Sequence, residues 1–107
     1  MTSSAPRETA DKTKRFILDV RGAYLRRTDW SFANMEGAKL SGTDLTNANL
    51  RGVNLKDARL DGTILRGADL TGAKNVTVEQ LRSAIIDETT KLPEGFDFEE
   101  LRRTAPA

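Results

Sequence analysis

The chain has 107 residues, with 17 Lys and Arg, 16 Asp and Glu and no His, and its formal net charge is +1. Without Cys it can form no disulfide, thiolate metal site or cysteine nucleophile, and without His it lacks the commonest general base and zinc ligand. No apolar run approaches the roughly 18 residues that a membrane span needs, and one domain is expected at this length.

Residues 1–17 are a polar N-terminal tail that we expect to be partly disordered before it leads into the first ordered turn. The stretch MTSSAPRETADKTKR contains no apolar segment of the kind that secretory signals carry. The expectation is therefore a soluble, cytoplasmic protein.

A five-residue repeat occupies residues 18–77. A small residue lies two positions before each repeated Leu, and Asp or Asn is common immediately before it, so that the consensus unit is A/T–D/N–L–x–G. Seven of the eight Gly share one other phase of the repeat. Leu occupies positions 25, 40, 45, 50, 55, 60, 65 and 70.

A period of five fits neither a regular helix nor a flat strand. On a helix, successive Leu would lie about 140° apart and would scatter around the axis. On a strand, an odd period sends successive side chains to opposite faces. A chain that turns a corner once per unit buries both the Leu and the small residue, because two positions apart on an extended side they point the same way. Gly, Asn and Asp suit the corner, since a turn there favours a positive φ.

The units AKLSG (38–42), TDLTN (43–47), ANLRG (48–52) and ADLTG (68–72) carry a resemblance to the pentapeptide-repeat family. The resemblance implies an all-β solenoid, a right-handed quadrilateral β-helix with four units per coil. The twelve units would form about three coils, a rod roughly 14 Å long at the usual strand spacing. Trp30 lies in the Leu column and is expected to be part of the core.

Residues 78–107 are predicted to form a short helical cap and tail. Thr77 and Gln80 have the spacing of a capping box, which predicts a helix near 78–86. A second short helix is predicted over 98–103.

The sequence contains no Ser–His pair, metal cluster or phosphate-binding loop, and a filled rod offers no cleft for catalysis. The Asp and Asn of the repeat have a structural role, because their side chains can bond the local backbone at each corner. We therefore expect no enzymatic activity, no cofactor and no metal. The resemblance implies a bacterial scaffold or protein–protein interaction module, such as a small subunit of a larger complex, with a protein partner of unknown identity.

Outward apolar residues indicate where that partner binds. Tyr24 and Ile64 occupy the normally polar outward phase, and four-unit coils place them on one side of the rod with Asp44 between them. Exposed apolar side chains can mark partner surfaces, and the alternative is that one of the termini covers them. The predicted partner surface consists of Tyr24, Arg26, Arg27, Phe32, Ile64 and Arg66.

Two further functions stay open. Some pentapeptide-repeat proteins imitate DNA and bind type II topoisomerases such as gyrase, but residues 18–77 hold nine basic and seven acidic side chains, a charge of the wrong sign. The same +2 is too small for a nucleic-acid-binding rod. The other alternative is a self-assembling homo-oligomer, for example a homodimer, joined through a rod end. Its predicted contacts are Phe96, Phe98 and Leu101.

Overall fold

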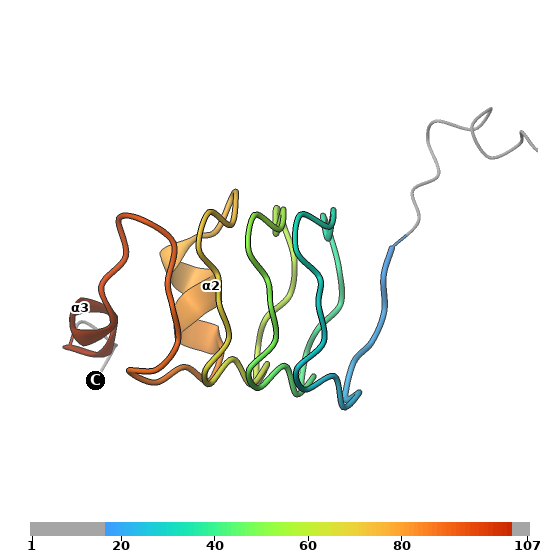
Figure 1. Cartoon of the computed structure of the whole chain (residues 1–107), viewed down its shortest axis with the longest axis horizontal. Coiled ribbons are helices and arrows are strands. Elements are labelled where there is room, and N and C mark those ends of the chain that lie inside the picture. The colour runs from blue at the N-terminus through green and yellow to red at the C-terminus, as the bar shows by residue number, and fades with distance from the viewer. Residues whose placement is uncertain (1–16, 104–107) are drawn as a thin grey trace, which may run out of the picture.

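The chain winds into a stack of coils whose backbones pair in parallel. The structure is a computed structural model that describes residues 17–103; the tail predicted before residue 17 lies outside this range. Asp19 pairs with Lys39, and Lys39 with Arg59, so neighbouring coils are related by 20 residues, or four repeat units. Figure 1 shows three such coils side by side, followed by the C-terminal segment. The four bridge columns are 19–39–59, 24–44–64–85, 29–49–69–91 and 34–54–74.

Pairing between the coils uses isolated bridges rather than extended strands. Asp44 donates its amide N–H to the carbonyl oxygen of Ala23 at 2.9 Å, and its own carbonyl accepts from the amide of Leu25 at 2.8 Å. A turn follows two residues later, so each side offers only one bridging residue to its neighbour. Of the all-β fold expected from the repeat, the structure shows the parallel pairing as isolated backbone bridges, and among residues 17–103 no continuous strand is formed.

The corners between sides adopt left-handed backbone conformations. Gly42 has a φ of 72°, and Asn47 and Asp57 have φ values of 61° and 60°. These residue types tolerate that region best, as the repeat phase predicted. Arg27 and Phe32 occupy the same phase with φ values of 61° and 62°, although neither residue type favours it.

The Leu column and the small-residue column fill the interior. The seven Leu from 40 to 70 are at most 2% exposed. The hydroxyls of Thr43 and Thr63 are buried with them and donate to the carbonyl oxygens of Val20 and Leu40, each at 2.7 Å. A buried hydroxyl is tolerated there because its hydrogen bond is made within the stack. Trp30, predicted to be core, is only partly buried and packs against the edge of this cluster.

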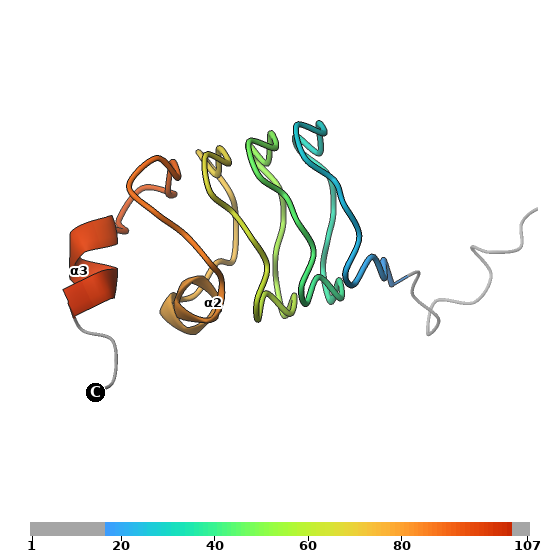
Figure 2. The same ribbon diagram turned by 90° about the horizontal axis from the view of Figure 1, so that it is seen from below.

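At the C-terminal end, helix α2 (Val78–Ser83) begins with the predicted capping box between Thr77 and Gln80. The helix was predicted to reach residue 86, but it ends at Ser83 because Ala84 is extended and Ile85 pairs with Ile64. In Figure 2, α2 follows the third coil, and the chain then passes beside that coil.

Two further contacts complete this end. Lys91 pairs with Asp69, so the bridges extend beyond the last recognisable repeat unit. Helix α3 (Phe98–Arg103) matches the predicted range and contacts α2, and Leu81 and Leu101 are both buried members of the hydrophobic core cluster. Over the described residues, no helix is long and apolar enough to cross a membrane.

Candidate interaction surface

One side of the stack carries Tyr24, Asp44, Ile64 and Ile85 in a single bridge column. We call this column the Tyr24 face. The phenol of Tyr24 is 85% exposed, Asp44 is buried, and Ile64 is half-buried beside Ile85. The C-terminal segment therefore borders Ile64, whereas no described residue covers Tyr24.

Asp44 is the buried acid that organises the charged side chains of this face. Its carboxylate accepts hydrogen bonds from the hydroxyl of Thr46 at 2.6 Å and from the Nε of Arg26 at 2.7 Å. The Thr46 hydroxyl, followed by the Arg26 guanidinium, lowers the pKa of Asp44 to about 2. Asp44 is therefore ionised at neutral pH, and it holds Arg26 in place while 66% of the Arg26 side chain stays exposed.

Two other predicted cations lie at the corner next to the Tyr24 face. Arg27 is exposed at a corner with positive φ, directly after Arg26. Arg66 is exposed two coils further along and is close enough to Asp87 to help lower the pKa of that carboxyl, after the larger effect of the Thr89 hydroxyl. The corner beside Tyr24 is consequently positive at its exposed surface.

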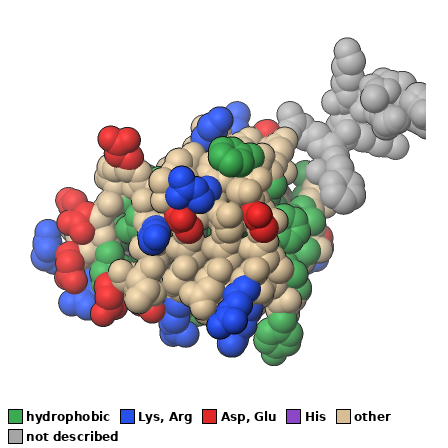
Figure 3. Space-filling model, in the orientation of Figure 1, with side chains coloured by type: hydrophobic (Ala, Val, Ile, Leu, Met, Phe, Trp, Pro, Cys, Tyr) green, Lys and Arg blue, Asp and Glu red, His purple; other side chains and the backbone are tan. Residues whose placement is uncertain are grey.

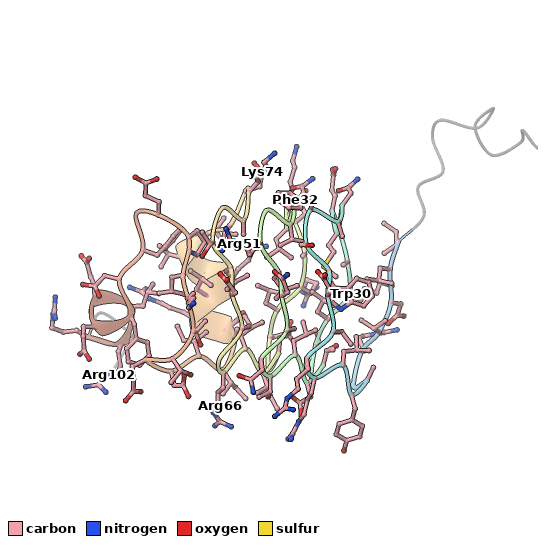
Figure 4. All side chains as sticks on the ribbon, in the orientation of Figure 1. Trp30, Phe32, Arg51, Arg66, Lys74 and Arg102 are labelled. Carbon is pink, nitrogen blue, oxygen red and sulfur yellow. The ribbon has the colours of Figure 1, made fainter. Side chains whose placement is uncertain are left out.

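Phe32 does not belong to this cluster. Figure 4 shows Phe32 at the upper edge of the stack and Arg66 at the lower edge. The Phe32 side chain is 78% exposed, but its ring leans over Gly52 of the next coil, where an added Cβ would lie 2.4 Å from the ring Cδ1. The six predicted surface residues thus divide into five around the Tyr24 face and one at another corner.

The three residues predicted to join rods end to end are not equally buried. Leu101 is only 6% exposed and is a core residue. Phe96 and Phe98 are half-buried, and the guanidinium of Arg102 lies 5.7 Å from the centre of the Phe98 ring. Leu101 therefore has little surface with which to meet another molecule.

Nothing in residues 17–103 groups three potential metal-binding His, Cys, Asp or Glu side chains. Sequence reasoning missed the burial of Asp44 and the pairing of Ile85 with Ile64. Both features depend on which residues stack across coils. For the contact between Arg26 and Asp44, the four-unit register was the only signal in the sequence that could have indicated it.

The family model for pentapeptide repeats matches residues 19–57 and 54–74, with eight copies of the repeat. The chain belongs to the pentapeptide-repeat family. It is similar to the pentapeptide repeat protein Rfr23 from the cyanobacterium Cyanothece 51142, with 36% identity and a TM-score of 0.61 over 69% of this chain. The match spans 50% of the Rfr23 chain, so this protein covers about half the length of that relative.

A second solved structure, alr5209 from Nostoc Pcc 7120, is also a pentapeptide repeat protein. It is 29% identical, with a TM-score of 0.31, over 79% of this chain and 82% of its own. No curated protein matches the chain.

Proposed function

We propose that this protein is a non-enzymatic interaction module that binds a protein partner through the Tyr24 face. In this proposal the repeat is the right-handed quadrilateral β-helix of its family and acts as a stiff column. The outward side chains can then vary without disturbing the Leu core. The observation that carries the proposal is an 85% exposed Tyr24 beside an arginine that a buried carboxylate holds in place.

Tyr and Arg are the residue types that most often dominate the energy of protein interfaces. An exposed Tyr offers a large apolar ring together with a hydroxyl that can donate or accept. Arg26 is already oriented by Asp44, so a partner would immobilise it at a smaller entropic cost than a free side chain. The expected partner therefore offers an apolar recess for Tyr24 and acidic groups for Arg26 and its neighbours.

A DNA mimic is less well supported. Such a surface needs exposed negative charge, but the acid of the Tyr24 face is buried and the neighbouring corner exposes Arg27 and Arg66. In a gyrase supercoiling assay, we expect no inhibition at micromolar concentrations of the protein. Inhibition there would replace the present proposal with the topoisomerase alternative.

The test begins with affinity capture on the full chain in its native host, followed by isothermal titration with the purified partner. Tyr24→Ala is expected to weaken binding by about tenfold or more, as the loss of a central aromatic contact usually does. Phe32→Asn is the matched control, because it removes another exposed aromatic at a corner away from the Tyr24 face and Asn tolerates the positive φ. Equal affinity of Tyr24→Ala and the unaltered protein would refute the proposal.

A further inference from the structure

The first coil ends the stack with incompletely buried apolar side chains. Trp30 is partly buried, whereas Leu50, in the next coil of the same column, is 2% exposed. Figure 4 shows Trp30 at the end nearest the N-terminal residues, and in Figure 3 hydrophobic side chains gather at that end of the visible face. The partly buried apolar residues of the first coil that pack against the core are Leu18, Val20, Leu25, Trp30 and Ala33.

The backbone of this coil also has unused pairing groups. In the second coil, Asp44 pairs in both directions, with Tyr24 before it and Ile64 after it. In the first coil, Tyr24 pairs only with Asp44, and its own amide N–H and carbonyl oxygen make no hydrogen bond among the described residues. The same holds for Asp29 and Asn34. An exposed edge of this kind is a template for pairing with another chain.

The opposite end of the stack is closed. Ile85 and Lys91 pair with the third coil, and α2 packs Leu81, with no exposed surface, against it. The sequence before residue 17 does not repeat the pattern that would supply an equivalent coil. Successive five-residue steps back from Val20 reach Arg15, Ala10 and Ala5, where an inward Leu would be needed.

We propose that this end, which we call the first-coil edge, pairs with the same edge of a second copy in a twofold homodimer. Each bridging residue offers both a donor and an acceptor, so the edge is complementary to itself. Its charged side chains are also balanced, so two copies meet without net repulsion. They are three acids, Asp19, Asp29 and Glu36, and three bases, Arg21, Arg26 and Arg27.

Trp30 is the only tryptophan in the chain and therefore reports on this edge. Light scattering after size exclusion of the full chain is expected to show a rise from 11.8 kDa toward twice that mass as concentration increases. Over the same range, Trp30 emission is expected to shift to the blue and acrylamide quenching to fall about twofold, because burial shields the indole. A mass that stays at that of one chain at all concentrations would overturn the proposal. Trp30 that is quenched throughout would then point to a different partner, and Trp30 that is protected throughout would point to cover of the edge by the chain itself.

A charge variant locates the contact. Asp19→Lys with Asp29→Lys leaves five bases and one acid on the first-coil edge, and like charges in an interface oppose association whichever sides meet. The dimer dissociation constant is expected to rise about tenfold or more. Asp61→Lys with Asp69→Lys makes the same change of total charge in the third coil and is expected to leave the constant within about twofold.

A dimer that both double variants weaken equally, or whose formation leaves Trp30 quenching unchanged, would show that another surface associates and would contradict the proposal. Circular dichroism of each variant establishes that it is folded. Tyr24→Ala distinguishes the two surfaces, because it removes the phenol of the Tyr24 face and retains the backbone groups of the edge. Loss of partner binding and loss of dimerisation are therefore separate results.

Discussion

The side-chain amide of Gln80 donates a hydrogen bond to the main-chain carbonyl oxygen of Leu55, 2.8 Å away. The same Nε2 reaches the carbonyl of Ala58 at 3.0 Å, and the Oε1 accepts from the amide of Thr77 at 2.9 Å. Elsewhere a Thr hydroxyl bonds the carbonyl of the Leu phase in the preceding coil, as Thr63 does for Leu40. Gln80 therefore caps the start of α2 and also satisfies two carbonyl groups of the stack.

Replacing Gln80 separates these two roles. Gln80→Glu retains the acceptor for the Thr77 amide but removes both donors to the coil, and is expected to lower the free energy of unfolding by about 1–3 kcal/mol. Thr77→Ala removes only the helix cap and is expected to cost about 1 kcal/mol. Urea unfolding followed by circular dichroism measures both. Equal stabilities of Gln80→Glu and the unaltered protein would show that the contact with Leu55 contributes nothing.

The ring of Phe32 occupies the space beside Gly52. Gly52→Ala is expected to destabilise the protein more than Gly72→Ala, because both backbones are left-handed but only at Gly52 would the new methyl meet a ring, at 2.4 Å. The left-handed conformation alone costs about 1–2 kcal/mol for a residue with a Cβ. In the double variant with Phe32→Gly, the excess cost at Gly52 should disappear, giving a coupling of about 1–2 kcal/mol in a double-mutant cycle. Additive effects would contradict the packing of Phe32 on Gly52.

Asp44 makes stability depend on acid pH. Its pKa of about 2 lies below the ordinary value of 3.8, so the ionised carboxylate favours the folded state. This contribution is complete above about pH 4 and is lost as the pH falls through 2. The stability difference between the unaltered protein and Asp44→Asn is therefore expected to shrink over that interval.

The variant Thr46→Val tests the cause of this low pKa. The Thr46 hydroxyl makes the largest contribution, so its removal is expected to raise the pKa of Asp44 more than Arg26→Gln does. Carboxyl carbon shifts in a pH titration by NMR measure the pKa of Asp44 in each variant. A value near 3.8 in the unaltered protein would refute the prediction.

Asn75 continues a column of side-chain amides after the Leu pattern has ended. Its amide donates to Asn54 at 2.8 Å, and Asn54 donates to Asn34 at 2.9 Å. Asn75→Gly keeps the φ of 62° but removes the donor, and is expected to cost about 0.5–1.5 kcal/mol. Asn75→Ala should cost about 1 kcal/mol more, because Ala is strained in the left-handed region. Thermal unfolding compares the two, and an equal loss would show that the backbone conformation adds nothing to the role of Asn75.

Much of the fold was predictable because the repeat is local. The Leu and small residues lie two positions apart on a short extended side, so their burial follows from one unit, as Leu45 and Thr43 show. The positive φ at Asn47 and the capping box of Thr77 likewise depend on residues within a few positions. For the candidate surface, the four-unit coil correctly placed Tyr24 and Ile64 in one column.

The remaining features are contacts between distant parts of the chain. Arg26 meets Asp44 across 18 positions, and Gln80 meets Leu55 across 25. Ile85 joins the bridge column of Ile64 at an interval of 21 residues rather than 20. Because Ile85 is extended in this pairing, α2 ends earlier than its helical pattern predicted.

The sequence by itself determined the period, the inward columns and the corners, since each follows from the stereochemistry of five consecutive residues. Only the tertiary structure decided that Asp44 is buried under Arg26, that Phe32 stands apart from Tyr24, and that one end of the stack is closed while the other exposes Trp30. The reason is physical: these properties depend on what stacks above and below a side chain, and the free energy of hydrogen bonding and burial is set by those neighbours.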